Sequence, residues 1–140
     1  MYNFAESLRD LIDEKGLSLR ELERECGVSS SQFSRYLKGV VPTIEISIKL
    51  ANFFGCSIDF LCGLTEDRSF SKYNNFDLNK FIDNYLSILK MQNKSHWKFA
   101  KENNFNEACL RHWKKGEKPK LSTLFLIAEG LDISIDDLIK

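Results

Sequence analysis

The chain has 140 residues with 20 basic and 20 acidic side chains, which suffices for one ordinary domain or two small ones. It contains no run of about 18 apolar residues and no signal-peptide pattern at its start, so we expect a cytoplasmic protein that does not enter a membrane. Two prolines and seven glycines interrupt many Leu, Glu, Lys and Ile residues, which favours helices over strands.

Capping and turn residues divide the first half of the chain into five short predicted helices. The first has an apolar face that begins at Phe4, and it ends near Gly16. The next four begin at residues suited to helix starts, which are Ser18, Ser29, Pro42-Thr43 and Ser57. Glu21 follows Ser18 by three residues and Gln32 follows Ser29 by three, which is the spacing of a capping box.

A linker is predicted over residues 65–77, because the segment Leu64–Asn79 is rich in Ser, Asn and charge and lacks periodic apolar residues. Its aromatic residues Phe70, Tyr73 and Phe76 leave docking on a neighbouring domain open. We therefore expect one domain at 1–64 and another at 78–140, with helices near 78–92, 96–103, 107–115, 120–130 and 134–139.

The second half repeats the first at a spacing of 77 residues. Phe4–Leu61 aligns with Phe81–Leu138 without a gap and gives eleven identical pairs. Chance would give roughly three or four in a stretch of this length. The blocks Lys-Gly-x-x-Pro and Ser-Ile-Asp-x-Leu also keep their distance from one another. We interpret the second half as a diverged copy of the first.

A tight turn joins the second and third predicted helices at Cys26-Gly27-Val28-Ser29. Gly27 suits a left-handed backbone, Val28 fills the space between the helices, and Ser29 caps the third helix. Phe33 and Tyr36 then point inward. The outer face is polar and cationic, and it consists of Ser30, Ser31, Ser34, Arg35 and Lys38.

Leu17–Ser29 (LSLRELERECGVS), together with Phe33–Gly39 (FSRYLKG) and Pro42, resembles the Cro/repressor-type (XRE) helix-turn-helix family. Leu50–Leu64 is similar to that family's fourth and fifth helices. The resemblance implies an all-α fold of two consecutive five-helix, lambda-repressor-like helix-turn-helix domains. It also implies a sequence-specific DNA-binding transcription regulator, in particular a repressor of bacterial or phage type, whose third helix enters the major groove of double-stranded DNA.

The resemblance assigns DNA-facing positions in both copies. In the first copy these are Ser29, Ser30, Ser31, Ser34, Arg35, Lys38 and Thr43, and in the second they are Asn106, Arg111, His112 and Lys115. Arginine pairs with guanine and asparagine with adenine, whereas lysines mostly contact phosphates. Thr43 and Lys120, at the start of each fourth helix, are expected to add phosphate contacts.

Four positions depart from the family pattern. Glu23 stands where the family usually has Ala at the crossing of the second and third helices, so its carboxylate must reach solvent or find a partner. Leu19 replaces a usual Gln, which removes an expected contact. In the second copy Asn104 replaces the turn glycine but tolerates a left-handed backbone. Glu107 faces DNA unfavourably unless it meets a cytosine amine.

An enzyme is not expected, because the chain has no glycine-rich phosphate loop and no spaced nucleophile and base. Cys26, Cys56, Cys62 and Cys109 lack paired spacing, so we expect no metal and interpret them as small apolar residues. We expect no cofactor and no small-molecule sensor domain. The alternative function is a protein-interaction module of the same fold, of anti-repressor or antitoxin type, which the zero net charge and Glu23 favour.

Charge is unevenly distributed: residues 1–70 carry a net charge of −3 and residues 71–140 a net charge of +3. Two arrangements on DNA follow. Either both copies dock on the unlike halves of one site, or one copy binds DNA while the chain forms a homodimer. Self-association is favoured because Glu23 and Glu107 each weaken one copy, and Ile133–Ile139 is the expected dimer surface.

Overall fold

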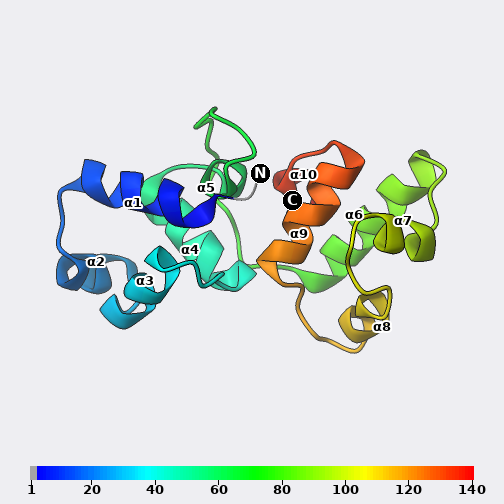
Figure 1. Cartoon of the computed structure of the whole chain (residues 1–140), viewed down its shortest axis with the longest axis horizontal. Coiled ribbons are helices and arrows are strands. Elements are labelled where there is room, and N and C mark those ends of the chain that lie inside the picture. The colour runs from blue at the N-terminus through cyan, green and yellow to red at the C-terminus, as the bar shows by residue number, and fades with distance from the viewer. Residues whose placement is uncertain (1–2) are drawn as a thin grey trace. The chain divides into compact units, whose positions relative to one another are not determined.

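The computed structural model describes residues 3–140, and the regular elements in that range are α-helices. The chain divides into two compact units, residues 1–74 and residues 75–140, whose helices are labelled in Figure 1. No helix within residues 3–140 is long and apolar enough to span a bilayer.

Unit 1 (residues 1–74) contains five helices around one core. They are α1 (Phe4–Lys15), α2 (Leu19–Cys26), α3 (Ser30–Leu37), α4 (Ile44–Phe54) and α5 (Ile58–Cys62). α1 packs against α3 and α5, and α2 packs against α3 and α4. The side chains at the centre are completely buried, and they include Leu8, Leu22, Phe33, Leu50 and Leu61. Each helix thus places an apolar stripe in a shared core and leaves its polar side in solvent.

Local chemistry sets the helix ends of unit 1 as predicted. Both capping boxes are present, at Ser18 with Glu21 and at Ser29 with Gln32. Gly27 ends α2 with a φ of 79°, which is the left-handed conformation that glycine adopts without strain. The geometry of the turn before α3 therefore follows from three consecutive residues whose preferences agree.

Tyr73, in the segment predicted as a linker, is docked on unit 1. Its side chain is buried, and its hydroxyl accepts a 2.9 Å hydrogen bond from the backbone N–H of Ile58 at the start of α5. Its backbone exchanges two hydrogen bonds with the amide side chain of Asn52 on α4. The predicted linker 65–77 is therefore not free along its length, because a polar aromatic residue anchors it at position 73.

Unit 2 (residues 75–140) also contains five helices. They are α6 (Leu78–Met91), α7 (His96–Glu102), α8 (Cys109–Lys114), α9 (Leu121–Leu131) and α10 (Ile135–Ile139). α8 begins two residues later than the prediction near 107–115. The reason is that the side-chain oxygen of Asn106 accepts a 2.9 Å hydrogen bond from the N–H of Ala108, which holds residues 106–108 in a turn.

The core of unit 2 contains a cluster of aromatic side chains. Trp113 is only 3% exposed, and its ring meets the edge of Phe81 at a centroid distance of 4.9 Å. α10 packs on α6 and α9, and Ile135 and Leu138 are completely buried there. The expectation that Ile133–Ile139 forms a dimer surface is therefore wrong, because the apolar side chains of α10 are buried against α6 and α9 of the same unit.

Candidate nucleic-acid interface

α2 and α3 of unit 1 form a compact pair joined by the turn at residues 26–29. Val28 is completely buried between them, as is Phe33 on the inner side of α3. Tyr36 is also buried and packs edge-to-face on Phe4 of α1 at 6.3 Å. These contacts fix the rotation of α3 about its axis, so the opposite side of the helix must face outward.

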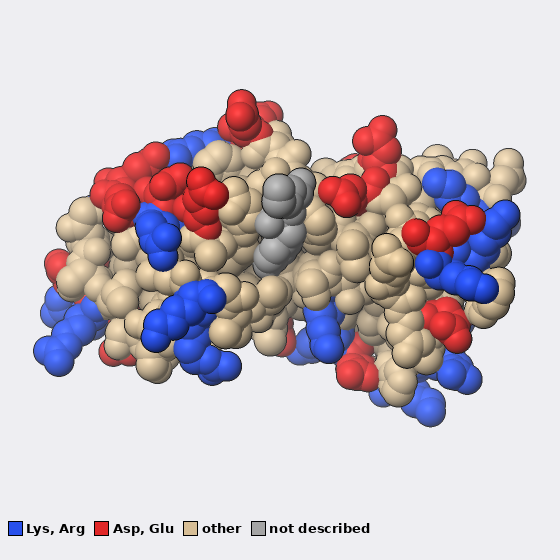
Figure 2. Space-filling view, viewed as in Figure 1, with Lys and Arg blue, Asp and Glu red and all other residues tan. Residues whose placement is uncertain are grey.

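The outward side of α3 presents the cationic residues predicted to contact DNA. Arg35, Lys38 and Ser31 are exposed, whereas Ser30 and Ser34 are half-buried. Figure 2 shows basic side chains along the edge of unit 1 where α2 and α3 lie, while acidic side chains gather over α1. The positive charge of this unit is thus displaced toward its helix-turn-helix edge.

Two of the predicted contact residues serve first as helix caps. The Ser29 hydroxyl accepts a hydrogen bond from the Gln32 N–H at 3.2 Å and donates to the Gln32 side-chain oxygen at 3.1 Å. Thr43 Oγ1 accepts from the Ile46 N–H at 3.3 Å, at the start of α4. The Thr43 hydroxyl is exposed and keeps its own proton for donation, whereas the Ser29 hydroxyl uses its proton within the protein.

Glu23 has found a partner at the start of α3. Its carboxylate Oε1 accepts a 2.8 Å hydrogen bond from the backbone N–H of Ser30, the first residue of that helix. The unusual carboxylate at the crossing of the two helices is therefore used as an additional cap. It also places a negative charge beside the predicted DNA-facing residues.

In unit 2 the predicted contact residues are less free. Arg111 and Lys115 are exposed on α8 and after it. The side chain of Asn106 is engaged in its own turn, and His112 Nδ1 lies 3.2 Å from a carboxylate oxygen of Glu117. Arg111 and Lys115 are consequently the stronger candidates for DNA contact in this unit.

His96 makes two hydrogen bonds that the sequence did not suggest. Its Nε2 donates a 2.8 Å hydrogen bond to the backbone carbonyl of Glu107, which requires a proton on that nitrogen. In the neutral ring, Nδ1 then accepts from the Tyr85 hydroxyl at 2.7 Å. His96 thereby links α6 to the turn before α8. The aligned residue in unit 1 is Leu19, so the repeat offered no signal for this contact.

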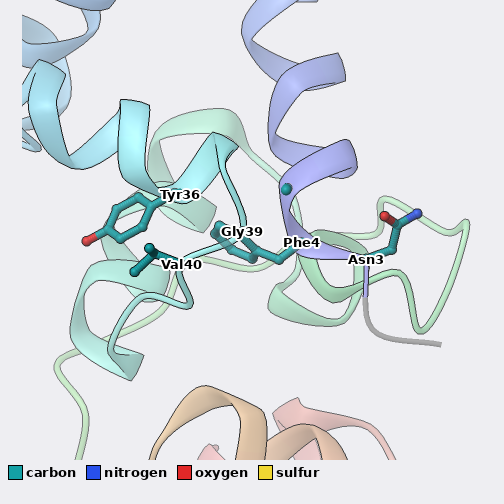
Figure 3. Close-up of a pocket in the computed structure, with 6 residues that line it drawn as sticks. Asn3, Phe4, Tyr36, Gly39 and Val40 are labelled. Carbon is teal, nitrogen blue, oxygen red and sulfur yellow. The ribbon is translucent and has the colours of Figure 1, made fainter.

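Hollows in both units border these surfaces. In unit 1 a cavity of about 180 Å³ lies between the start of α1 and the loop after α3, lined in part by Phe4, Tyr36 and Val40 (Figure 3). The described residues that line it carry no charged side chain. In unit 2 a groove of about 280 Å³ is lined by residues that include His112, Lys118 and Lys120. That groove extends the cationic side of α8 toward the start of α9.

Two of the four cysteines are packed as apolar residues, whereas Cys26 and Cys109 are half-buried. Cys56 and Cys62 are completely buried, and burial raises the pKa of the Cys56 thiol to about 11. Burial also raises the pKa of Cys62. Among residues 3–140, no three His, Cys, Asp or Glu side chains lie close enough together to hold a metal ion. The thiols of Cys56 and Cys62 therefore contribute to packing at neutral pH.

Comparison with known proteins identifies one region of the chain. Residues 8–61 match the model of a helix-turn-helix family, and this region runs from α1 to α5 of unit 1. The match does not extend into residues 75–140. No curated protein and no solved structure matches the chain. This region of unit 1 is thus similar to a helix-turn-helix domain, a kind of domain that suggests a DNA-binding regulator.

Proposed function

We propose that this protein is a sequence-specific transcription regulator that binds double-stranded DNA with α3 in the major groove and acts as a repressor. One observation carries the proposal: the region matched by the helix-turn-helix model contains an α3 whose buried side is fixed and whose outer side exposes Arg35 and Lys38. Repression requires only that the bound protein occupies its site, which two small helical units achieve without a further domain.

We also propose that unit 2 is a second, diverged helix-turn-helix domain. The backbone supports this. Four residues of unit 2 have a positive φ, and each lies 77 positions after a left-handed glycine of unit 1. The pairs are Gly16 with Asn93, Gly27 with Asn104, Gly39 with Gly116, and Gly55 with Asp132. Only one of the four is a glycine in both units, so the correspondence comes from backbone geometry beyond residue identity.

Two different DNA-binding units on one chain favour an asymmetric DNA site. The outer residues differ, since unit 1 offers Ser34 and Arg35 where unit 2 offers Arg111 and His112. Tyr73 is anchored on unit 1 and α6 begins at Leu78, so only residues 74–77 join the units. A short connection holds the second head at a high effective concentration beside the DNA. We therefore expect two unlike half-sites in close succession.

Selection from a pool of random duplexes tests the proposal. We expect the wild-type protein to enrich one sequence with two unlike halves, and hydroxyl-radical footprinting to protect both. The variant Arg35→Ala should lose the first half. Protection confined to one half would contradict DNA binding by unit 2. A pool that stays unenriched would reject sequence-specific binding altogether.

A protein-interaction function is the alternative, because two large apolar side chains of unit 2 are exposed. Trp97 is 59% exposed at the start of α7, and Met91 is 81% exposed at the end of α6. The Lys101 ammonium lies 5.0 Å from the centre of the Trp97 ring. Exposed aromatic residues of this kind are common anchors of protein interfaces. A wild-type protein that retains no duplex would favour this alternative.

A further inference from the structure

Glu23 occupies the place on unit 1 where a fixed acceptor has the largest effect on DNA recognition. In helix-turn-helix proteins the first residues of the recognition helix lie nearest to the base edges. Glu23 Oε1 is held at that end of α3 by the 2.8 Å hydrogen bond from the Ser30 N–H. The Glu23 side chain is exposed, so its charge is presented to whatever approaches the start of α3.

The hydrogen bond from the Ser30 N–H holds the Glu23 carboxylate in place without neutralising it. The hydroxyls of Ser29 and Ser31 lie 3.1 Å apart within the first turn of α3, and Ser29 is tied to Gln32. The hydrogen-bond donor to the carboxylate is a neutral backbone amide. A carboxylate in this setting can only accept hydrogen bonds, and its second oxygen has room to do so.

We propose that Glu23 is a specificity-determining residue of unit 1, which selects cytosine or adenine over guanine or thymine at one position of the strand that it faces and opposes the approach of phosphates. This inference rests on the proposed DNA-binding function. In the major groove cytosine N4 and adenine N6 are the hydrogen-bond donors, whereas guanine offers only acceptors. Phosphate oxygens are acceptors that also carry charge. A fixed carboxylate therefore favours a cytosine or adenine amine and repels the sugar–phosphate backbone.

Two substitutions on the same helix separate this role from a general charge effect. Glu23→Gln removes the charge but keeps a side-chain oxygen that can accept from the Ser30 N–H, so the start of α3 is retained. Glu25→Gln makes the same change in net charge at an exposed position two residues along α2, which faces a different direction. Circular dichroism and thermal unfolding of both variants confirm that each remains folded.

Selection from random duplexes with the three proteins is the test. We expect wild-type protein and Glu25→Gln to share a preference for an amine-bearing base at one position, and Glu23→Gln to relax it by roughly five- to a hundredfold. Glu23→Gln should also bind unselected duplex more tightly than Glu25→Gln does.

Each contrary result has its own meaning. If all three proteins enrich the same sequence with the same preference at every position, Glu23 is only a helix cap and the assignment is wrong. If the wild-type protein enriches no duplex, DNA reading itself is rejected, and the role of Glu23 with it.

Discussion

Arg35 is the residue on which the proposed recognition of DNA by unit 1 depends most. It is exposed on α3, one position before the buried Tyr36, so its guanidinium faces away from the core. Its five donors in a fixed plane suit guanine better than any other side chain on this face. The serines beside it offer short hydroxyls that adapt to several bases, so they add less discrimination.

We expect Arg35→Ala to weaken binding to a selected duplex by about 1–3 kcal/mol while the fold stays intact. The control is Arg24→Ala, which removes an exposed arginine of α2 outside the predicted contact set. Fluorescence anisotropy measures both affinities. Equal affinities for the two variants would contradict the prediction that Arg35 contacts DNA.

A second residue-scale prediction concerns Cys56, whose pKa is raised from 9.0 to about 11 by burial. Between these values the native state keeps a proton that the unfolded chain loses, so the stability contributed is full below pH 9 and falls as the pH rises. Wild-type protein should therefore lose about 1–2 kcal/mol more unfolding free energy than Cys56→Ala between about pH 9 and pH 11. Urea unfolding at the two pH values gives the comparison, and parallel losses would contradict it.

Helix ends are the elements that local sequence determines best. The capping boxes at Ser18 and Ser29 and the left-handed Gly27 were predictable because each depends on residues within three or four positions. The late start of α8 was not predictable, since a helix start and the turn made by the Asn106 side chain compete for the same residues. The partners of His96 and Tyr73 come from other helices, and no local pattern encodes them.

The candidate site follows the same division. The exposure of Arg35, Lys38, Arg111 and Lys115 was predictable from helical periodicity on a recognised motif. The contact of His112 with Glu117 was not predictable, because it joins α8 to the loop beyond it. For Glu23 the sequence predicted only that its carboxylate must reach solvent or find a partner. Its partner, the Ser30 N–H, required the crossing geometry of α2 and α3.

At the scale of single turns, we expect Asn104→Ala to lower the unfolding free energy by about 1 kcal/mol, and Asn104→Gly not to lower it. Asn104 has a φ of 63°, which alanine adopts only at a cost of roughly 1–2 kcal/mol and glycine adopts freely. Asn79→Ala, at an exposed position of α6, is the control and should not destabilise. Chemical unfolding resolves the difference, and equal stability of the Ala and Gly variants at position 104 would contradict the argument.

For the whole molecule, the division into two compact units has a direct consequence. Each unit has its own set of completely buried side chains, such as Leu22 and Leu50 in one and Tyr85 and Leu124 in the other. We therefore expect a fragment of residues 1–74 to fold alone and to bind a selected duplex at least about tenfold more weakly than the intact chain, because the second head is lost. Tyr73 must be included, since it packs on α4 and α5. A fragment that binds as tightly as the whole chain would leave unit 2 without a part in recognition.

The measurement that tests the account most directly is the affinity for a selected duplex at several salt concentrations between about 50 and 200 mM. Arg35, Lys38, Arg111 and Lys115 are the exposed cations assigned to the DNA, and about four phosphate-neutralising contacts give a slope of log affinity against log salt near −3 to −4. We expect that slope for the wild-type protein, and a slope shallower by about one for Lys115→Ala. Binding that is absent, or that does not change with salt, would contradict the central claim that this protein holds double-stranded DNA with both of its units.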